Sequence, residues 1–272
     1  MAERTIYFAK ITRQPQRRLF DTDFHHDLLA ALIPAQHVTR YHRDWRFSRP
    51  TEIGTDFITG KLGFVRRAPT AATTYDDAIQ DFVTTQALAD EGSFTMYAVD
   101  TNREVVAFED RPPDIRRQSF VGAFRALLDE NDFPAAVEPL TDPNDFDRWA
   151  ASVDRVVRVR AVVHSPNPEW HAGAELVRRI VQESAAERAE VVAVARPDTG
   201  LDARAPWIDG ALQQVAEHGQ GKVSATGVAR GIKTTWESWT RLRTSTIHEN
   251  ETTTPQQVWE WLLSKLRDLH DE

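Results

Sequence analysis

The sequence predicts an α+β fold, built from mixed or antiparallel sheets with helices packed on one face, in two subdomains. Two β-rich runs, Phe94–Val99 and Glu104–Phe108, are separated by a polar turn and indicate a hairpin. Strand-like and helix-like segments alternate irregularly along the chain, which does not suit a doubly wound parallel sheet. The last helix has a complete N-terminal capping box, formed by Thr254 and Gln257 with a proline at the first helical position.

Alternation and capping residues define the elements of the first third of the chain. A strand at Thr5–Ile11 carries the bulky β-formers Tyr7 and Phe8. Asp23 is suited to cap a helix that ends before Pro34. Two strands are expected next, with a bulge or bend in the second because it contains two glycines: His37–Phe47 and Asp56–Val65.

The middle third is predicted to be mainly helical around the hairpin. Asp76–Leu88 has helical character, and Asp114 caps a helix with apolar residues at helical spacing. A short strand and a short amphipathic helix follow, at Val137–Leu140 and Asp145–Ala151.

The clearest strand is Val153–Val163, whose odd positions are all apolar or small except Arg155, while its even positions include Arg158 and Arg160. A helix from Glu169 to Arg188 and a buried strand at Val191–Ala195 complete an expected β-α-β unit. The remaining elements are a helix, two strands and the terminal helix: Pro206–His218, Gly221–Arg230, Thr234–Arg243 and the helix after Thr254.

A domain boundary is expected near residue 150, where an acidic segment ends. Residues 1–150 would form an N-terminal α+β domain with an acidic second half, and 151–272 a C-terminal α+β domain with basic strands and the terminal helix. The 272 residues, 41% of them hydrophobic, suffice to bury such cores.

Composition excludes several classes of site. The chain has no cysteine, so disulfides, thiolate zinc sites and cysteine catalysis are excluded. No apolar stretch approaches the roughly 18–20 residues that span a bilayer, and the N-terminal apolar run is too short for a signal peptide. The expected location is the cytoplasm.

Charge is segregated along the chain. The net charge is −8, yet residues 1–70 carry +5 and residues 71–150 carry −11. A basic surface is therefore compatible with an acidic protein.

No catalytic motif is present, so no catalytic residue, metal or cofactor is expected. The nearest approach to a metal cluster, His25-His26-Asp27, consists of adjacent helical residues that point in different directions. Sequential carboxylate pairs such as Asp76-Asp77 are typical of solvated turns and helix ends. A metal-dependent nuclease remains an alternative that the sequence allows without indicating it.

Basic residues are the candidate binding groups, as phosphate contacts for nucleic acid. One set lies on the clearest strand and in the last third of the chain: Arg158, Arg160, Lys222, Arg230, Lys233, Arg241 and Arg243. A second set lies near the N-terminus, where Arg40 and Arg46 are expected to share one strand face: Arg40, Arg46, Arg66 and Arg67.

Local strings resemble the RexA family of prophage superinfection-exclusion proteins. The strings are Ile6-Tyr7-Phe8-Ala9 before a leucine-rich helix, the hairpin Phe94–Phe108, and Val137-Glu138-Pro139-Leu140-Thr141 leading into residues 154–161. The resemblance covers most of the chain in layout and is close only at these points. It implies a cytoplasmic, homodimeric DNA-binding protein that senses phage infection and acts with a RexB-like membrane protein.

The expected function is thus sequence-nonspecific binding of double-stranded DNA in superinfection exclusion or abortive infection. Two alternatives remain open: a phage-activated nuclease, and a protein-interaction module whose acidic 71–150 segment meets a basic partner.

Overall fold

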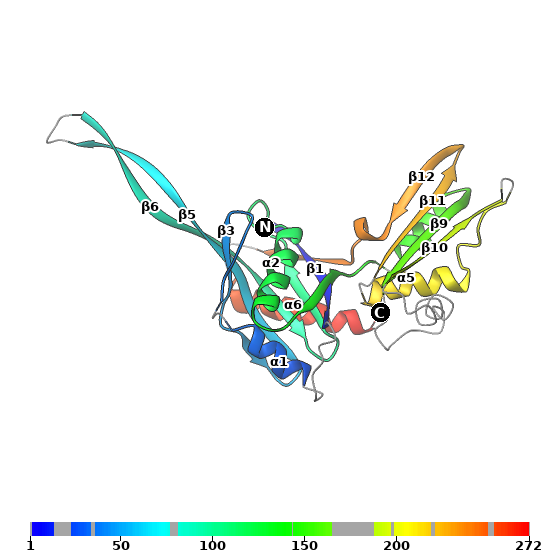
Figure 1. Cartoon of the computed structure of the whole chain (residues 1–272), viewed down its shortest axis with the longest axis horizontal. Helices are drawn as coiled ribbons and strands as arrows, with labels where there is room; N and C mark the ends of the chain where they lie inside the picture. Colours follow the sequence, from blue (N-terminus) through cyan, green and yellow to red (C-terminus); the bar gives the residue numbers. More distant parts are fainter. Residues whose placement is uncertain are drawn as a thin grey trace.

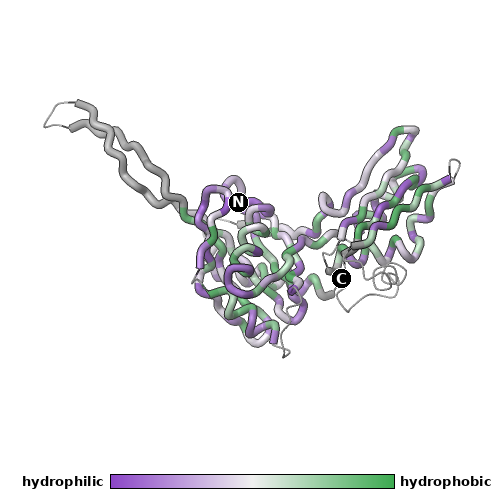
Figure 2. The backbone as a smooth tube through the Cα atoms, in the orientation of Figure 1, coloured by the Kyte–Doolittle hydropathy of each residue, from purple (hydrophilic) through white to green (hydrophobic). Residues whose placement is uncertain are grey.

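The protein forms two antiparallel sheets with helices, which confirms the α+β class (Figure 1). The computed structural model describes residues 2–13, 23–33, 36–76, 81–142, 144–164, 188–196, 199–218, 221–249 and 253–271. All strand pairings within these ranges are antiparallel. Hydrophobic and hydrophilic residues alternate along the coloured strands of the small sheet (Figure 2).

The large sheet has the strand order β13-β1-β7-β6-β5-β3-β2, with β4 paired to β5 and β8 paired to β1. Its strands are β1 (Ala2–Arg13), β2 (Val38–Arg40), β3 (Arg43–Phe47), β4 (Thr51–Ile53), β5 (Phe57–Asp76), β6 (Asp81–Asp100), β7 (Val105–Glu109), β8 (Ala135–Pro139) and β13 (Thr244–Glu249). Three helices accompany it: α1 (Phe24–Ala31), α2 (Arg117–Glu130) and α6 (Pro255–Asp271).

Helices cover both faces of the large sheet, so the expectation of helices on one face is wrong for this sheet. Buried residues of α1 and α2 share a hydrophobic core with one face. Buried leucines of α6 share a second core with the opposite face. The predicted capping box at the start of α6 is confirmed, since the Thr254 backbone N–H donates to Gln257 Oε1 at 2.8 Å.

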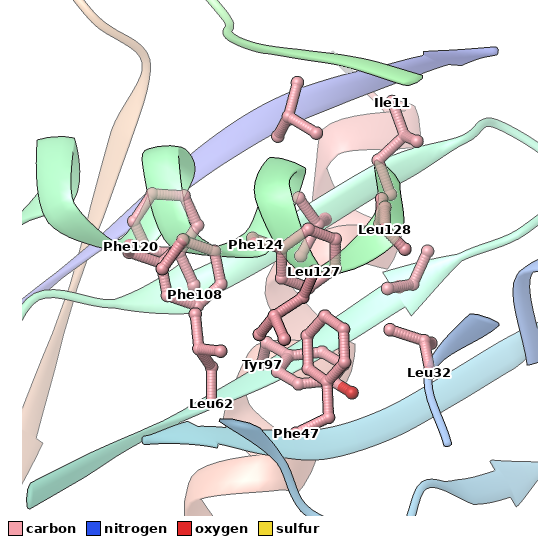
Figure 3. Close-up of a cluster of buried hydrophobic side chains, with 14 of the residues drawn as sticks. Ile11, Leu32, Phe47, Leu62, Tyr97, Phe108, Phe120, Phe124, Leu127 and Leu128 are labelled. Carbon is pink, nitrogen blue, oxygen red and sulfur yellow. The ribbon is translucent and has the colours of Figure 1, made fainter. Parts of the chain in front are cut away.

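Aromatic rings form the centre of the first core (Figure 3). The ring centroid of Phe124 on α2 lies 5.1 Å from that of Phe47 and 5.3 Å from that of Tyr97, and both pairs have edge-to-face geometry. Phe120, one turn earlier, stacks on Phe108 at 3.9 Å. Such pairs add specific geometry to the burial of large apolar areas, and burial also raises the pKa of Tyr97.

The predicted helix at Asp76–Leu88 is wrong, because the described part of this segment is strand. β5 and β6 pair without interruption from Phe57↔Asp100 to Asp76↔Asp81. Beyond the Asp44↔Val65 pair with β3, they pair only with each other. Residues 66–76 and 81–91 therefore form a two-stranded ribbon, called the arm, about 36 Å long at about 3.3 Å per residue, and Figure 1 shows it projecting from the sheet.

The expected strand His37–Phe47 is a hairpin. Tyr41 and His42 both have positive φ, 55° and 58°, and form the two-residue turn between β2 and β3. Gly60 and Gly63 cause no bulge, because β5 keeps its register with both neighbours. A Cβ atom at Gly60 would instead lie 2.4 Å from Tyr97 Oη, so glycine is needed for this close approach.

The small sheet has the order β10-β9-β11-β12. Its strands are β9 (Arg155–His164), β10 (Arg188–Val194), β11 (Lys222–Ala229) and β12 (Ile232–Glu237), with α3 (Asp145–Ser152), α5 (Pro206–His218) and the 3-10 turn η2 (Ser238–Thr240). β10 runs antiparallel to β9, which contradicts a β-α-β crossover. The helix expected from Glu169 falls in 165–187, outside the described residues.

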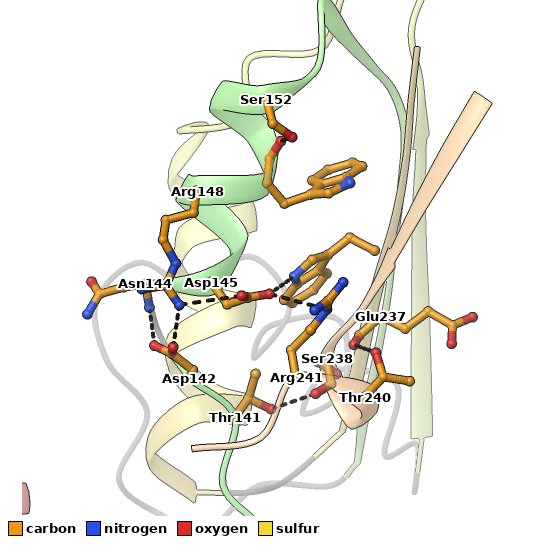
Figure 4. A network of polar contacts seen from close by, with 12 residues as sticks. Thr141, Asp142, Asn144, Asp145, Arg148, Ser152, Glu237, Ser238, Thr240 and Arg241 are labelled. Carbon is orange, nitrogen blue, oxygen red and sulfur yellow. Dashed lines mark hydrogen bonds and ion pairs between the residues drawn. The ribbon is translucent and has the colours of Figure 1, made fainter. Parts of the chain in front are cut away.

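The chain enters and leaves the small sheet through one connector, formed by residues 140–142 and 241–243 (Figure 4). Asp142 N–H donates to Arg241 O at 2.9 Å, and Arg243 N–H donates to Leu140 O at 2.8 Å. Thr141 and Leu242 form the bridge between them. The strand expected at Thr234–Arg243 is therefore interrupted by η2 and this connector.

The strand pairing divides the chain differently from a cut at residue 150. The small sheet does begin just beyond that point, but β13 pairs with β1 and α6 packs on the large sheet. Residues 244–271 thus belong structurally with the N-terminal elements. Among the described helices, none is both long enough and apolar enough to cross a membrane.

Replacing Phe124 by alanine should lower the free energy of unfolding by about 3–5 kcal/mol, because a fully buried ring at the centre of the core is lost. Urea unfolding followed by circular dichroism measures the change. The control is Arg125→Gln, whose side chain is 51% exposed on the next position of α2 and should change stability by less than about 0.5 kcal/mol. Equal effects at both positions would contradict the packing described.

Candidate nucleic-acid interface

One face of the small sheet packs on α3 and α5, and no described helix covers the other, which is called the open face. The packed face carries Val159, Ala161, Val223 and Trp236, which share a hydrophobic core with helix residues such as Ile208. Side chains alternate between the two faces of a strand. The residues between these core positions therefore point to the opposite face.

Arg158 and Arg160 occupy adjacent rows of the open face. Arg158 lies opposite Thr226 and Val194, and Arg160 lies opposite Ser224 and Val192. Residues directly opposite in an antiparallel pair share a face. Val194 is 68% exposed and Val192 is 42% exposed, so no described part of the chain covers these rows.

A register shift alters the predicted alternation of the strand. Thr226 pairs with Arg158 but Gly227 pairs with Val156, which leaves Val157 as an extra residue on β9. Val156 was expected on the face of the two arginines, yet it is 4% exposed and belongs to the core. Beyond the bulge Val228 pairs with both Arg155 and Lys233, so the next row is also basic.

The open face therefore collects cations from three strands, and four of them belong to the predicted set. Its basic members are Arg155, Arg158, Arg160, Lys222 and Lys233. Two carboxylates share it, Glu190 and Glu237. Basic groups thus outnumber acidic ones on this surface.

Arg158 and Arg160 differ in electrostatic environment. Arg158 is exposed and forms no ion pair with any other described residue. Arg160 makes two hydrogen bonds to Glu190, each 2.8 Å long. The hydrogen bonding and charge of Glu190 raise the pKa of Arg160. One predicted phosphate contact is therefore occupied by a carboxylate.

The other three residues of the first predicted set lie outside the rows of the open face. Arg230 is exposed at the turn between β11 and β12, where its backbone N–H donates to Asp154 Oδ2 at 2.7 Å. Arg241 lies at the connector, 3.5 Å from Asp145, and Arg243 follows it there. Neither shares the open face.

The N-terminal set is dispersed by the fold. Arg40 donates to the Gly122 backbone carbonyl of α2, on the same side as Arg43. Arg46 is exposed between the buried Trp45 and Phe47, so it points away from Arg40, and the expectation that they share a face is wrong. Arg66 and Arg67 lie at the base of the arm, where the backbone register of β5 and β6 places them opposite Glu91 and Asp90.

A second basic site lies between the two sheets, and Arg40 and Lys222 both line it. This cleft has a volume of about 600 Å³ and is walled by α2 and β8 on one side and by β11 and η2 on the other. The cleft has four further charged residues that the sequence pattern did not indicate as site residues: Arg117, Arg125, Asp129 and Glu138. The eight-residue spacing of Arg117 and Arg125 does place them on one helix face, but nothing local predicts what that face meets.

Glu138 is the one cleft residue with a strongly shifted pKa. Burial raises the pKa of Glu138 to about 7, while the nearby charges of Lys222 and Arg125 act to lower it. Near neutral pH this carboxyl is therefore partly protonated, which leaves the surrounding cations less neutralised.

His25 and Asp27, two residues of the candidate metal cluster at the start of α1, contact different partners. The ring nitrogens of His25 contact Thr101 Oγ1 at 3.0 Å and Glu52 Oε2 at 3.2 Å. Asp27 instead pairs with Arg13 at 2.6 Å. No three metal-ligating side chains gather anywhere in the described ranges.

Replacing Glu138 by glutamine should stabilise the protein in a pH-dependent way. Below about pH 4.5 the carboxyl is protonated in both the folded and unfolded chain, so the variant should match the wild type. Above pH 7 the folded wild type must ionise a buried carboxyl, and the variant should be more stable by up to about 3 kcal/mol. Urea unfolding from pH 4.5 to 8 tests this, and a difference that does not change with pH would contradict it.

The sequence matches no protein-family model and no curated protein. The resemblance to the RexA family therefore remains a prediction.

Proposed function

We propose that this protein binds double-stranded DNA through the phosphate backbone, without reading base sequence, on the open face of the small sheet. The observation that carries the proposal is the gathering of Arg158, Lys222 and Lys233 with Arg160 on one exposed surface. Lysine and arginine contacts to phosphates supply affinity that does not depend on sequence.

The polar residues between these cations fit the same role. Ser224, Thr226 and Thr235 lie in the rows of Arg160 and Arg158. Hydroxyl groups commonly donate hydrogen bonds to phosphate oxygens and so fix the orientation of a duplex. The rows of β9, β11 and β12 thus carry short polar side chains between the cations, while Val192 and Val194 of β10 are exposed at the edge of the same face.

The acidic 71–150 segment gives less support to a protein-interaction module. Several of its carboxylates are engaged within the chain: Glu109 with Arg4 at 2.9 Å, and Asp142 with Arg148 at 2.5 Å. The segment is also divided among the arm, the large sheet and the connector. A role in superinfection exclusion, a homodimeric state and a RexB-like membrane partner rest on the family resemblance alone.

Removing two unneutralised cations should weaken DNA binding and its salt dependence together. For Arg158→Gln combined with Lys233→Gln, the slope of log K against log salt should become shallower by about 2, since each cation releases about 0.9 counterion. Fluorescence anisotropy with two unrelated duplexes of equal length measures it, and both duplexes should respond alike. The control is Arg125→Gln on α2, which packs on the large sheet. Equal losses with this control, or no binding by the wild type at low salt, would refute the proposal.

Removing the partner of Arg160 should have the opposite effect. Glu190→Gln frees a guanidinium on the open face and deletes a negative charge there, so duplex affinity at low salt should rise about two- to tenfold. Glu260→Gln on the exposed side of α6 makes the same change in net charge at a distance. If both variants gain equally, net charge rather than the open face governs binding.

A further inference from the structure

The cleft between the sheets is a separate site with the dimensions of a small-molecule pocket. Its volume of about 600 Å³ lies within the roughly 300–1,000 Å³ typical of such pockets. The connector fixes its two walls, because Thr141 of the β8 side donates to the Ser238 carbonyl of η2 at 3.2 Å. Thr141 and Ser238 are both almost fully buried, and both line the cleft.

Cations converge on the cleft from three elements. Arg40 comes from β2, Arg117 and Arg125 from α2, and Lys222 from the start of β11. Within the described ranges the ion pair that these cations form is loose, since Arg125 Nε lies 3.9 Å from an oxygen of Asp129 at the exposed rim. Guanidinium groups offer paired donors that match phosphate oxygens.

The position of Arg40 depends on the glycine that it faces. Arg40 Nη1 donates to the Gly122 carbonyl. A Cβ atom at Gly122 would lie 3.0 Å from Tyr41 Oη and 3.3 Å from Arg40 Nη1. The absence of a side chain at Gly122 therefore lets the guanidinium lie against α2 at the wall of the cleft.

An aromatic surface completes the lining. Trp239 of η2 lines the cleft and is 39% exposed, whereas Trp45 and Trp236 are fully buried. Lys222 Nζ lies 5.7 Å from the centre of its ring. An exposed indole beside a cation can stack a planar heterocycle while the cation meets an attached anion.

We infer that this cleft binds a small phosphorylated ligand of the nucleotide class, with its phosphate between Arg40, Arg125 and Lys222 and its base against Trp239. The cleft and the open face share Lys222 and no other residue. Arg158 and Lys233 do not line the cleft, so variants at these two positions test DNA binding without changing the nucleotide site.

Glu138 couples this site to pH. The charged groups around it are Arg117, Arg125 and Asp129 from α2, Arg40 from β2, Lys222 from β11, and Lys10 from β1. Lys10 is directed elsewhere, with its ammonium 2.6 Å from the Arg103 carbonyl and 3.4 Å from Glu104. An entering anion favours the protonated form of Glu138, so affinity should fall as pH rises from 6.5 to 8.5.

Calorimetric titration of the full chain with adenosine monophosphate, inorganic phosphate and adenosine at pH 7 tests the inference. Adenosine monophosphate should bind at one site, about tenfold or more tighter than either fragment, since stacking and phosphate contacts each contribute. Arg125→Gln and Trp239→Leu should each weaken it about tenfold, and Trp239→Phe should restore most of the loss. Glu138→Gln should abolish the fall in affinity between pH 6.5 and 8.5.

Arg158→Gln serves as the control, because it should weaken DNA binding and leave nucleotide binding unchanged. The inference is overturned if adenosine monophosphate binds no better than inorganic phosphate, or if Arg125→Gln and Trp239→Leu have no effect on it. Loss of DNA binding with retained nucleotide binding would refute only the proposed function.

Discussion

The hydrogen-bonded connector between residues 140–142 and 241–243 is the constraint on which both candidate sites depend. β8 and β13 lie end to end along the same side of β1, so the chain leaves the large sheet and returns to it at one point. Backbone hydrogen bonds on both sides of the Thr141↔Leu242 bridge hold the two segments together. Asp145 strengthens this junction, since it accepts from Trp236 Nε1 at 2.8 Å and lies near Arg241 (Figure 4).

This junction explains why charges far apart in the sequence meet. β8 brings Glu138 to the connector from one side, and η2 with the start of β11 brings Lys222 from the other. Among the described helices, α3 and α5 cover one face of the small sheet and none covers the rows of Arg158 and Arg160. A protein with a net charge of −8 can in this way present a locally basic surface.

Patterns carried by local chemistry predicted much of the fold. The capping box at Thr254, the helical spacing of Phe120 and Phe124, and the period-two arginines of β9 all correspond to the structure. The errors occur where pairing with distant residues decides the outcome. The segment 81–88 contains helix-forming residues, yet β6 pairs along its whole length with β5, opposite β-formers such as Tyr75 and Thr73. The bulge that buries Val156 depends on the register with β11, which the sequence of β9 alone does not encode.

The same distinction between local sequence patterns and contacts of distant residues applies to the candidate sites. Arg158 and Arg160 could be placed on one face from their spacing, and Lys222 and Lys233 were chosen for their charge. That they join the same face follows from the order β9-β11-β12, a tertiary fact. The pairing of Arg160 with Glu190 and the meeting of Arg125 with Glu138 likewise depend on contacts that no local pattern contains.

Lysine footprinting with duplex DNA tests the central claim most directly, because the chain has only five lysines and two of them lie on the open face. Lys222 and Lys233 are exposed on the open face, Lys61 and Lys265 lie with the large sheet and α6, and Lys10 is buried. Acetylation measured by mass spectrometry should show DNA protecting Lys222 and Lys233 while Lys61 and Lys265 react as before. Protection confined to Lys61 and Lys265, or unchanged reactivity at Lys233 in the DNA-bound protein, would contradict the account.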